Sequence, residues 1–239
     1  MANNFKAPKQ TKPNNEETYF TWFLDDLVQN GFIEKYDRES EITEVLPPFS
    51  YHREVHYKEK ENVLENYNLL PEITYTYDFR IIWTEKAHYV FTEVFQKNGC
   101  FRFNTPIFVS HYVMIDGVKK MASYVDVKPH YKAVQFGGGK MASYYTFPLI
   151  QKFLLHTRGL FINKIVPVNS GKNGVNTCLF AQTFTPRRYH FTDGGQQPRN
   201  IPFRKIRLES FLAMKQNMIN ELIRQNERKQ QKNAQQGLF

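Results

Sequence analysis

The sequence predicts a single mixed α/β domain, and three observations lead to this prediction. Segments with helical and strand-like periodicity alternate along the 239 residues, in the order helix, strands, helix, strands, helix. Apolar residues make up 41% of the chain and aromatic residues 15%, which is enough for one sizeable core and too much for a disordered polymer. No repeat with the period of a solenoid is present. We therefore expect a mixed central β-sheet flanked by helices.

The first element is expected to be a helix over 16–29. Apolar residues recur there with the spacing of one helix face: Tyr19, Phe20, Phe23, Leu24 and Leu27. Asn14 or Asn15 can cap the start of this helix, and Gly31 follows its end. The more polar stretch 34–68 then predicts loop with an edge strand.

A series of strands is expected next. The segment 73–83 is rich in β-branched and aromatic residues, and further strands are expected at about 88–96, 106–115 and 121–128. Asn98-Gly99 and Asp116-Gly117 lie between them and are typical of hairpin turns. The first of these turns predicts a β-hairpin inserted into the domain.

The second half of the chain predicts helix 147–156, strands at about 160–168 and 177–184, and a closing amphipathic helix over 208–224. The domain is expected to span 16–225, with a C-terminal extension from about 170. A basic leader, 1–15, and a polar tail, 226–239, are expected to be disordered because their composition is rich in Asn, Gln, Lys and Pro.

The charge balance favours a polyanionic partner. Lys and Arg number 32 and Asp and Glu number 23, so the formal net charge is +9. Solubility alone also accounts for a surplus of this size. Two cysteines make no disulfide framework, and no apolar run is long enough for a membrane helix or a signal peptide. We expect a cytoplasmic protein with no membrane association, in the host cytoplasm if a phage encodes it.

Three charged residues interrupt the apolar strands and predict a metal site. Asp126 and Lys128 are two residues apart, so they project from the same face of a strand, with the Val127 carbonyl close by. Asp78 lies within the preceding strand segment. Two carboxylates and a carbonyl suit Mg²⁺, and a neighbouring lysine can orient a water for attack on a phosphodiester. Taken singly, Asp78 is also typical of a structural acceptor, and Asp-x-Lys of a solvated edge strand.

The order of these motifs resembles the PD-(D/E)xK nuclease superfamily, and within it the phage-borne Holliday-junction-resolvase-like nucleases. The matching parts are a Glu-bearing helix that leads to a Gly-containing stop at 30–33, the strand from Ile73 to Phe79, the Asp126-Val127-Lys128 strand, and a helix leading into a short strand at 161–166. The resemblance spans about 16–168. It implies a restriction-endonuclease-like fold and a metal-dependent DNA endonuclease, acting on branched DNA in phage recombination, replication or packaging.

The resemblance also implies roles for individual residues. Asp78, Asp126 and the Val127 carbonyl would bind Mg²⁺, for which Mn²⁺ would substitute, and Lys128 would serve the attacking water. Glu17 would complete the acidic cluster, with Glu16 as the substitute for that role. A homodimer is expected, because two-fold symmetric cutting needs two sites.

Other signals give weaker predictions. Lys132, Lys140, Arg187 and Arg188 are candidate contacts to the DNA backbone, although ordinary surface charge is nearly as good an explanation. Gly137-Gly138-Gly139-Lys140 lacks the Ser/Thr of a phosphate-binding loop, and His52 and His56 lack the partners of a zinc site. Two alternatives to a nuclease stay open: a catalytically inactive nucleic-acid-binding protein on the same fold, and a virion or assembly protein.

Overall fold

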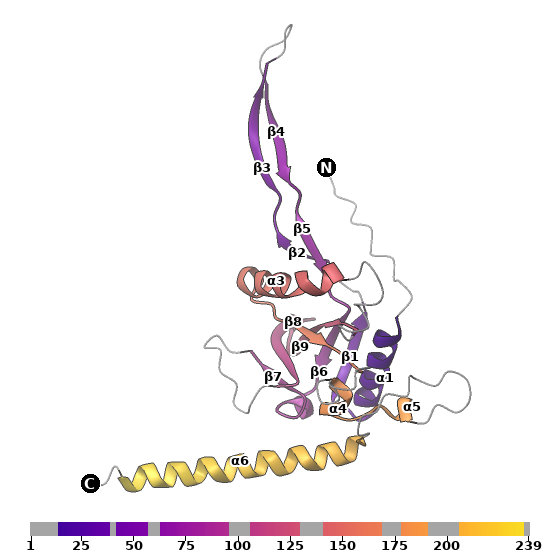
Figure 1. The fold of residues 1–239 in the computed structure, drawn as a ribbon. Coiled ribbons are helices and arrows are strands. Elements are labelled where there is room, and N and C mark those ends of the chain that lie inside the picture. The colour runs from indigo at the N-terminus through magenta and orange to yellow at the C-terminus, as the bar shows by residue number, and fades with distance from the viewer. Residues whose placement is uncertain are drawn as a thin grey trace.

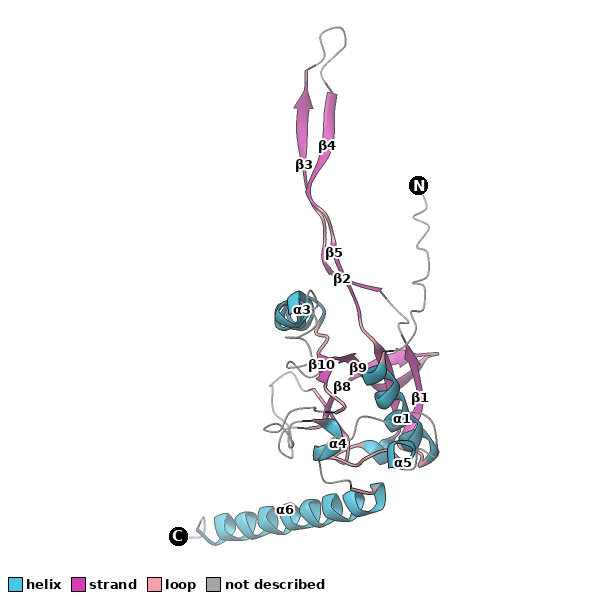
Figure 2. Ribbon diagram, turned by 45° about the vertical axis from the view of Figure 1, so that its right-hand side comes forward, coloured by secondary structure: helices cyan, strands magenta, loops and turns pink. Residues whose placement is uncertain are grey.

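The computed structural model describes residues 14–38, 42–56, 63–95, 106–129, 141–168, 178–190 and 206–236. It confirms the mixed α/β domain, with a six-stranded mixed sheet at its centre (Figures 1 and 2). The strand order is β1 (Ile33–Arg38), β6 (Phe79–Trp83), β9 (Val118–Val127), β8 (Phe108–Ile115) and β7 (Thr92–Val94). The central strand β9 is antiparallel to β6 and β8, and β10 (Ile162–Ile165) pairs with its C-terminal end in parallel.

Helices cover both faces of the sheet, because β9 is apolar on both sides. Val125 and Val127 belong to the core beneath α1 (Asn15–Gln29), whereas Ala122 and Tyr124 belong to the core beneath α3 (Met141–Arg158). Figure 2 shows α1 and α3 on opposite sides of the strands. The two faces of β9 are therefore an α1 side and an α3 side, and residues of even number point to the α3 side.

The first helix and one of the hairpin turns are confirmed. The Asn14 side chain accepts from the main-chain N–H of Glu17 at 2.8 Å and caps α1, and Gly31 follows with a φ of +72°. Asp116 and Gly117 join β8 to β9 with φ values of +51° and +77°, the left-handed pair that a tight hairpin requires. Asn98-Gly99 lies outside the described residues.

The largest difference from expectation is a long antiparallel ribbon that precedes β6 and rises from the body of the domain (Figure 1). Its base is formed by β2 (Ile42–Leu46) and β5 (Ile73–Thr76), and its outer half by β3 (Phe49–Val55) and β4 (Val63–Leu70). Loop with one edge strand is expected over 34–68; the structure instead has most of the described residues of this stretch in the strands β1 to β4. The strand expected over 73–83 is divided at Tyr77-Asp78, so that β5 belongs to the ribbon and β6 to the central sheet.

Four further elements differ in type or length. Of the strand expected at 88–96, the described residues form only the short strand β7, and a 3₁₀ turn, η1 (Glu85–Ala87), lies just before this segment. The strand expected at 177–184 is wrong, because this segment contains the short helix α4 (Leu179–Gln182), followed by α5 (Arg187–His190). The helix α3 begins at Met141. The closing helix α6 (Leu208–Gln236) continues through most of the residues expected to form a tail.

Strands β8 and β10 pair with successive parts of the same edge of β9, and Asn163 lies where the two meet. Its buried side chain accepts from the Val109 N–H at 2.7 Å and donates to the carbonyls of Val109 at 2.9 Å and Tyr124 at 3.0 Å. Val109 is on β8, Tyr124 on β9 and Asn163 itself on β10, and the Val109 carbonyl also accepts from the Ser123 hydroxyl at 2.9 Å. One amide side chain therefore links three strands by hydrogen bonds.

We expect Asn163→Ala to lower the free energy of unfolding by about 2–4 kcal/mol, because it removes the Asn163 partner of the Val109 N–H and of the Tyr124 carbonyl in the interior. Urea denaturation followed by circular dichroism measures the change. Asn66→Ala, on the exposed outer ribbon, is the matched control and should change the same quantity by less than about 0.5 kcal/mol. A loss below about 1 kcal/mol for Asn163→Ala would show that water replaces the amide.

Within the described residues, no helix combines the length and the apolar character needed to cross a bilayer.

Candidate functional site

Asp78, Asp126 and Lys128 come together where β6 begins and β9 ends. The two strands are antiparallel, and the last pair in their register joins Phe79 to Val125, so the residues just outside this pair are neighbours. The Asp78 N–H donates to the Val125 carbonyl at 2.9 Å. The prediction that these three residues share one site is consistent with this register. The alternative, that Asp126-x-Lys128 lies on a solvated edge strand, does not hold, because β9 is a central strand.

Asp78 is placed by the break between β5 and β6. The chain comes from the ribbon and enters the central sheet there, so β6 offers no further main-chain carbonyl to β9. The Asp78 carboxylate takes this place, because its Oδ2 accepts from the Val127 N–H at 2.6 Å. The N–H and C=O of one strand residue point the same way, so the Val127 carbonyl also faces the Asp78 side.

Asp126 is the most deeply buried member of the site, with 2% of its surface exposed. Its Oδ1 lies 2.8 Å from Lys128 Nζ, and its Oδ2 accepts from the Tyr75 hydroxyl at 2.5 Å. Both partners are on the α3 side, where Lys128 Nζ lies 5.8 Å from the centre of the Phe147 ring. The carboxylate is therefore held from two directions, with water largely excluded.

The two carboxylates are close enough to affect each other's ionisation. Burial is the main cause that raises the pKa of Asp78, to about 8, and the negative charge of Asp126 and a hydrogen bond shared with it contribute to this rise. The Val127 N–H and the Lys128 ammonium act in the opposite direction. Burial, together with Asp126, also raises the pKa of Tyr75, so its hydroxyl stays protonated and donates. Near neutral pH, the pair thus retains a proton that a cation can displace.

Tyr75 is a site residue that the sequence analysis did not find. It lies on β5, at the base of the ribbon, 51 residues from its partner Asp126 in the chain. Its ring also packs near Phe147 of α3, with 6.5 Å between the ring centres. Tyrosines alternate along this segment, and no sequence signal distinguishes Tyr75 from its neighbours. It is a positioning residue, because it acts on Asp126.

Glu17 reaches the same end of the sheet from the α1 side. It forms a capping box with Asn14, and its Oε2 lies 2.6 Å from Arg38 Nη2. Arg38 is opposite Phe79 in the register of β1 and β6, next to Asp78. Glu17 is thus bonded to Asn14 and Arg38, whereas Asp126 and Lys128 project toward α3. Among the described residues, no group of three or more His, Cys, Asp or Glu side chains forms a metal-binding cluster.

The candidate DNA contacts fall in different places. Arg187 and Arg188 begin α5, beside α1: the Arg187 N–H donates to Asp26 Oδ2 at 2.8 Å, and the Arg188 guanidinium lies 5.2 Å from the centre of the Trp22 ring. They are therefore on the side of the sheet opposite to Lys128. Lys132 and Lys140 lie outside the described residues, as do residues 137–139.

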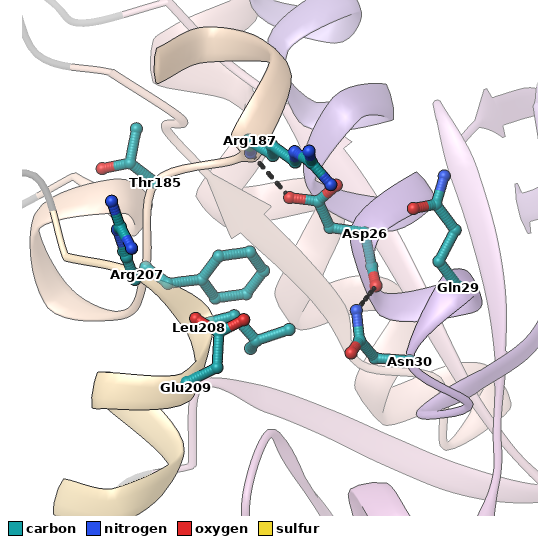
Figure 3. Close-up of a pocket in the computed structure, with 9 residues that line it drawn as sticks. Asp26, Gln29, Asn30, Thr185, Arg187, Arg207, Leu208 and Glu209 are labelled. Carbon is teal, nitrogen blue, oxygen red and sulfur yellow. Dashed lines mark hydrogen bonds between the residues drawn. The ribbon is translucent and has the colours of Figure 1, made fainter. Parts of the chain in front are cut away.

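A separate hollow of about 620 Å³ lies between α1 and the start of α6. Figure 3 shows Asp26 between Arg187 and Asn30 on one wall, with Arg207 and Glu209 on the other. The two acidic and two basic side chains that line it give it no net charge. Neither Asp78 nor Asp126 is among its lining residues. The closely spaced charges around Asp126 therefore make the end of β9 the stronger candidate for chemistry.

Comparison of the chain with protein-family models, with curated proteins and with solved structures finds no match.

Proposed function

We propose that this protein is a metal-dependent endonuclease that hydrolyses phosphodiester bonds in DNA. The observation that carries the proposal is the meeting of two carboxylates and one ammonium group, those of Asp78, Asp126 and Lys128, at adjoining ends of two central strands. Two crowded carboxylates with a cation-binding carbonyl nearby suit a divalent metal ion. An adjacent ammonium group suits a reaction in which negative charge develops on phosphate oxygens.

The residues present fit Mg²⁺, with Mn²⁺ as its substitute. The carboxylates of Asp78 and Asp126 and the carbonyl of Val127 would hold the ion, and all three are the hard oxygen ligands that Mg²⁺ prefers. The raised pKa of Asp78 is the sign of this fit, since it reports negative charge crowded in a buried place. Bound Mg²⁺ would stabilise charge on the phosphate and favour ionisation of a water molecule.

Lys128 would position the nucleophile. Its ammonium group is held by Asp126 at 2.8 Å while 19% of its side chain stays exposed, so it can donate to a water or a phosphate oxygen that enters from solvent. Tyr75 and Lys128 bond different oxygens of Asp126 and so fix the plane of its carboxylate. Such fixed geometry favours catalysis because little reorganisation is needed when the substrate binds.

The order of elements supports a nuclease of the PD-(D/E)xK type. The chain has, in order, a Glu-bearing helix, a strand that Asp78 precedes, a strand ending in Asp126-x-Lys128, a helix and a short parallel strand. This is the order that the resemblance to PD-(D/E)xK nucleases implies. We extend the proposal to branched DNA, such as a four-way junction, as the substrate, and to a role in phage DNA recombination, replication or packaging. The net charge of +9 favours a polyanionic substrate.

A second candidate function is assembly. The projecting ribbon exposes several large apolar side chains, including Phe49, Leu64 and Leu70 at 58%, 69% and 60%. Surfaces of this kind mark protein contacts. A virion or assembly protein that retains the fold without cleaving DNA would also account for them.

The test uses labelled four-way junction and matched linear duplex, incubated with Mg²⁺ or with EDTA, beside the Asp126→Ala variant. We expect cutting that requires Mg²⁺ and is lost in the variant, and the preferred substrate identifies the kind of nuclease. Salt-sensitive binding without cutting on either substrate would instead favour the inactive nucleic-acid-binding protein. The absence of both binding and cutting would favour the assembly function.

A further inference from the structure

A second lysine lies beside Asp126, on the neighbouring strand. Lys164 of β10 is the register partner of Asp126 in β9, and paired residues of adjacent strands share a face of the sheet, with the strands about 4.8 Å apart. The pair before it in the same register and on the same face, Ile162 and Tyr124, belongs to the core beneath α3. Lys164 therefore projects on the α3 side, as Asp126 and Lys128 do.

Asp126 thus has a different neighbour on each side along the sheet. On the side of β6, the hydroxyl of Tyr75 donates to it from the base of the ribbon, and on the side of β10 its neighbour is Lys164. Within the described residues, β10 pairs with no strand other than β9. Lys164 is half-buried, and a lysine in such a place covers its stem and keeps its ammonium group in water. This ammonium group is therefore within reach of a ligand that arrives from solvent.

The ribbon has the opposite sign of charge to the whole chain. Its described residues, 42–56 and 63–76, hold one basic and four acidic side chains, a net charge of 1 − 4 = −3 in a chain whose total is +9. Negative charge repels phosphates. A DNA strand with one phosphate at Asp126 is therefore favoured to continue over β10 and not along the ribbon. Arg187 and Arg188 are on the α1 side and do not face this path.

We propose that Lys164 binds the phosphate next to the one that is cut and so positions the DNA strand across Asp126. Given the proposed nuclease function, on which this inference rests, the two lysines divide the substrate between them. Lys128 is held by Asp126 at 2.8 Å and serves the reacting phosphate. Lys164 extends from the next strand and reaches further along the DNA backbone. A lysine suits this contact because it is a flexible point charge, and phosphate contacts set the register of the DNA.

Binding of DNA by Lys164→Met tests the contact without cleavage. The full chain is titrated in EDTA against labelled duplex and four-way junction at several salt concentrations, with fluorescence anisotropy as the readout. We expect Kd to rise by at least about threefold on both DNAs, and the slope of log K against log salt to fall by about 0.9, the value for one phosphate contact. Lys119→Met, at the exposed start of β9, should change neither quantity.

Circular dichroism confirms that both variants are folded. If Lys164→Met has the same Kd and the same salt slope as Lys119→Met, the proposal is overturned. Because binding in EDTA needs no catalysis, an effect on binding from a protein that cuts no DNA would reject the proposed nuclease and keep Lys164 as a phosphate contact.

Cleavage kinetics and a modified substrate locate the phosphate. Lys164→Met should raise KM by at least about threefold and leave kcat within about threefold of the wild type, because the contact holds the substrate before and during the reaction. Replacing the phosphate that Lys164 binds by an uncharged methylphosphonate should weaken binding by the wild type and not by Lys164→Met. A lower kcat with unchanged KM, or a methylphosphonate effect that is equal in both proteins on either side of the cut, would reject the proposed contact.

Discussion

Asp78→Asn should lower the rate of Mg²⁺-dependent DNA cleavage on the order of a thousandfold and should at the same time stabilise the metal-free protein near pH 8. The loss of rate follows because an amide is a weaker ligand for Mg²⁺ than a carboxylate, and a metal ion contributes several kcal/mol to charge stabilisation. The gain in stability follows because the substitution removes an ionisable group from a buried pair. Activity and stability thus move in opposite directions.

The raised pKa of Asp78 determines how the stability of the protein changes with pH. The pKa of Asp78 is about 8 in the folded protein, against 3.8 for an aspartate fully exposed to water. The folded state therefore retains a proton that the unfolded state has lost between these values, and the stability from this group falls as pH rises from about 4 to about 8. We expect a slope of at most about 1.4 kcal/mol per pH unit in the wild type, and a smaller slope in Asp78→Asn.

Urea denaturation in EDTA at about pH 5 and about pH 8 measures the slope, and a cleavage assay measures the rate. Asp116→Asn is the matched control, because it makes the same change in an exposed turn, and Asn also tolerates the positive φ found there. This control should leave both quantities near those of the wild type. Cleavage by Asp78→Asn within about tenfold of the wild-type rate would remove Asp78 from the metal site.

Local signals explain which parts of this fold could be predicted. Helix α1 has a cap at Asn14 and an apolar stripe, and the Asp116-Gly117 turn needs only the left-handed conformation that these residues tolerate. The separation of Asp126 from Lys128 places both on one face of any strand. Each of these features is determined within a few residues, so the sequence alone predicts them.

The missed features depend on distant contacts. The strands of the outer ribbon contribute nothing to the core, so their sequence lacks the apolar runs that indicate a buried strand, and it predicts only loop with one edge strand. The break at Tyr77-Asp78 is set by pairing on both sides of it, with β2 before and with β9 after. Tyr75 becomes part of the site only through this break, because β5 leaves the sheet beside Asp126.

Lys128→Met is the second change for which we expect a large effect, a fall in the cleavage rate of about 10²- to 10⁴-fold, the range for loss of a group that serves proton transfer. Methionine matches the lysine side chain as far as Cε, with sulfur in place of Cδ, so it keeps the unbranched apolar stem beside Phe147 and lacks the ammonium group. Lys119→Met is the matched control: Lys119 is on the same strand, exposed, with its Nζ 4.1 Å from the centre of the Tyr112 ring. This control should cleave DNA at about the wild-type rate.

Metal binding distinguishes the proposed role of Lys128 from a purely structural one. The ammonium group lies 2.8 Å from Asp126, where it competes with a cation for the same carboxylate. Removing it should therefore raise the affinity for Mn²⁺ in a calorimetric titration, while cleavage falls. Damage to the fold would weaken metal binding and cleavage together, and a lysine outside the site would change neither. Tighter Mn²⁺ binding with slower cleavage thus requires an ammonium group that acts after the metal ion has bound.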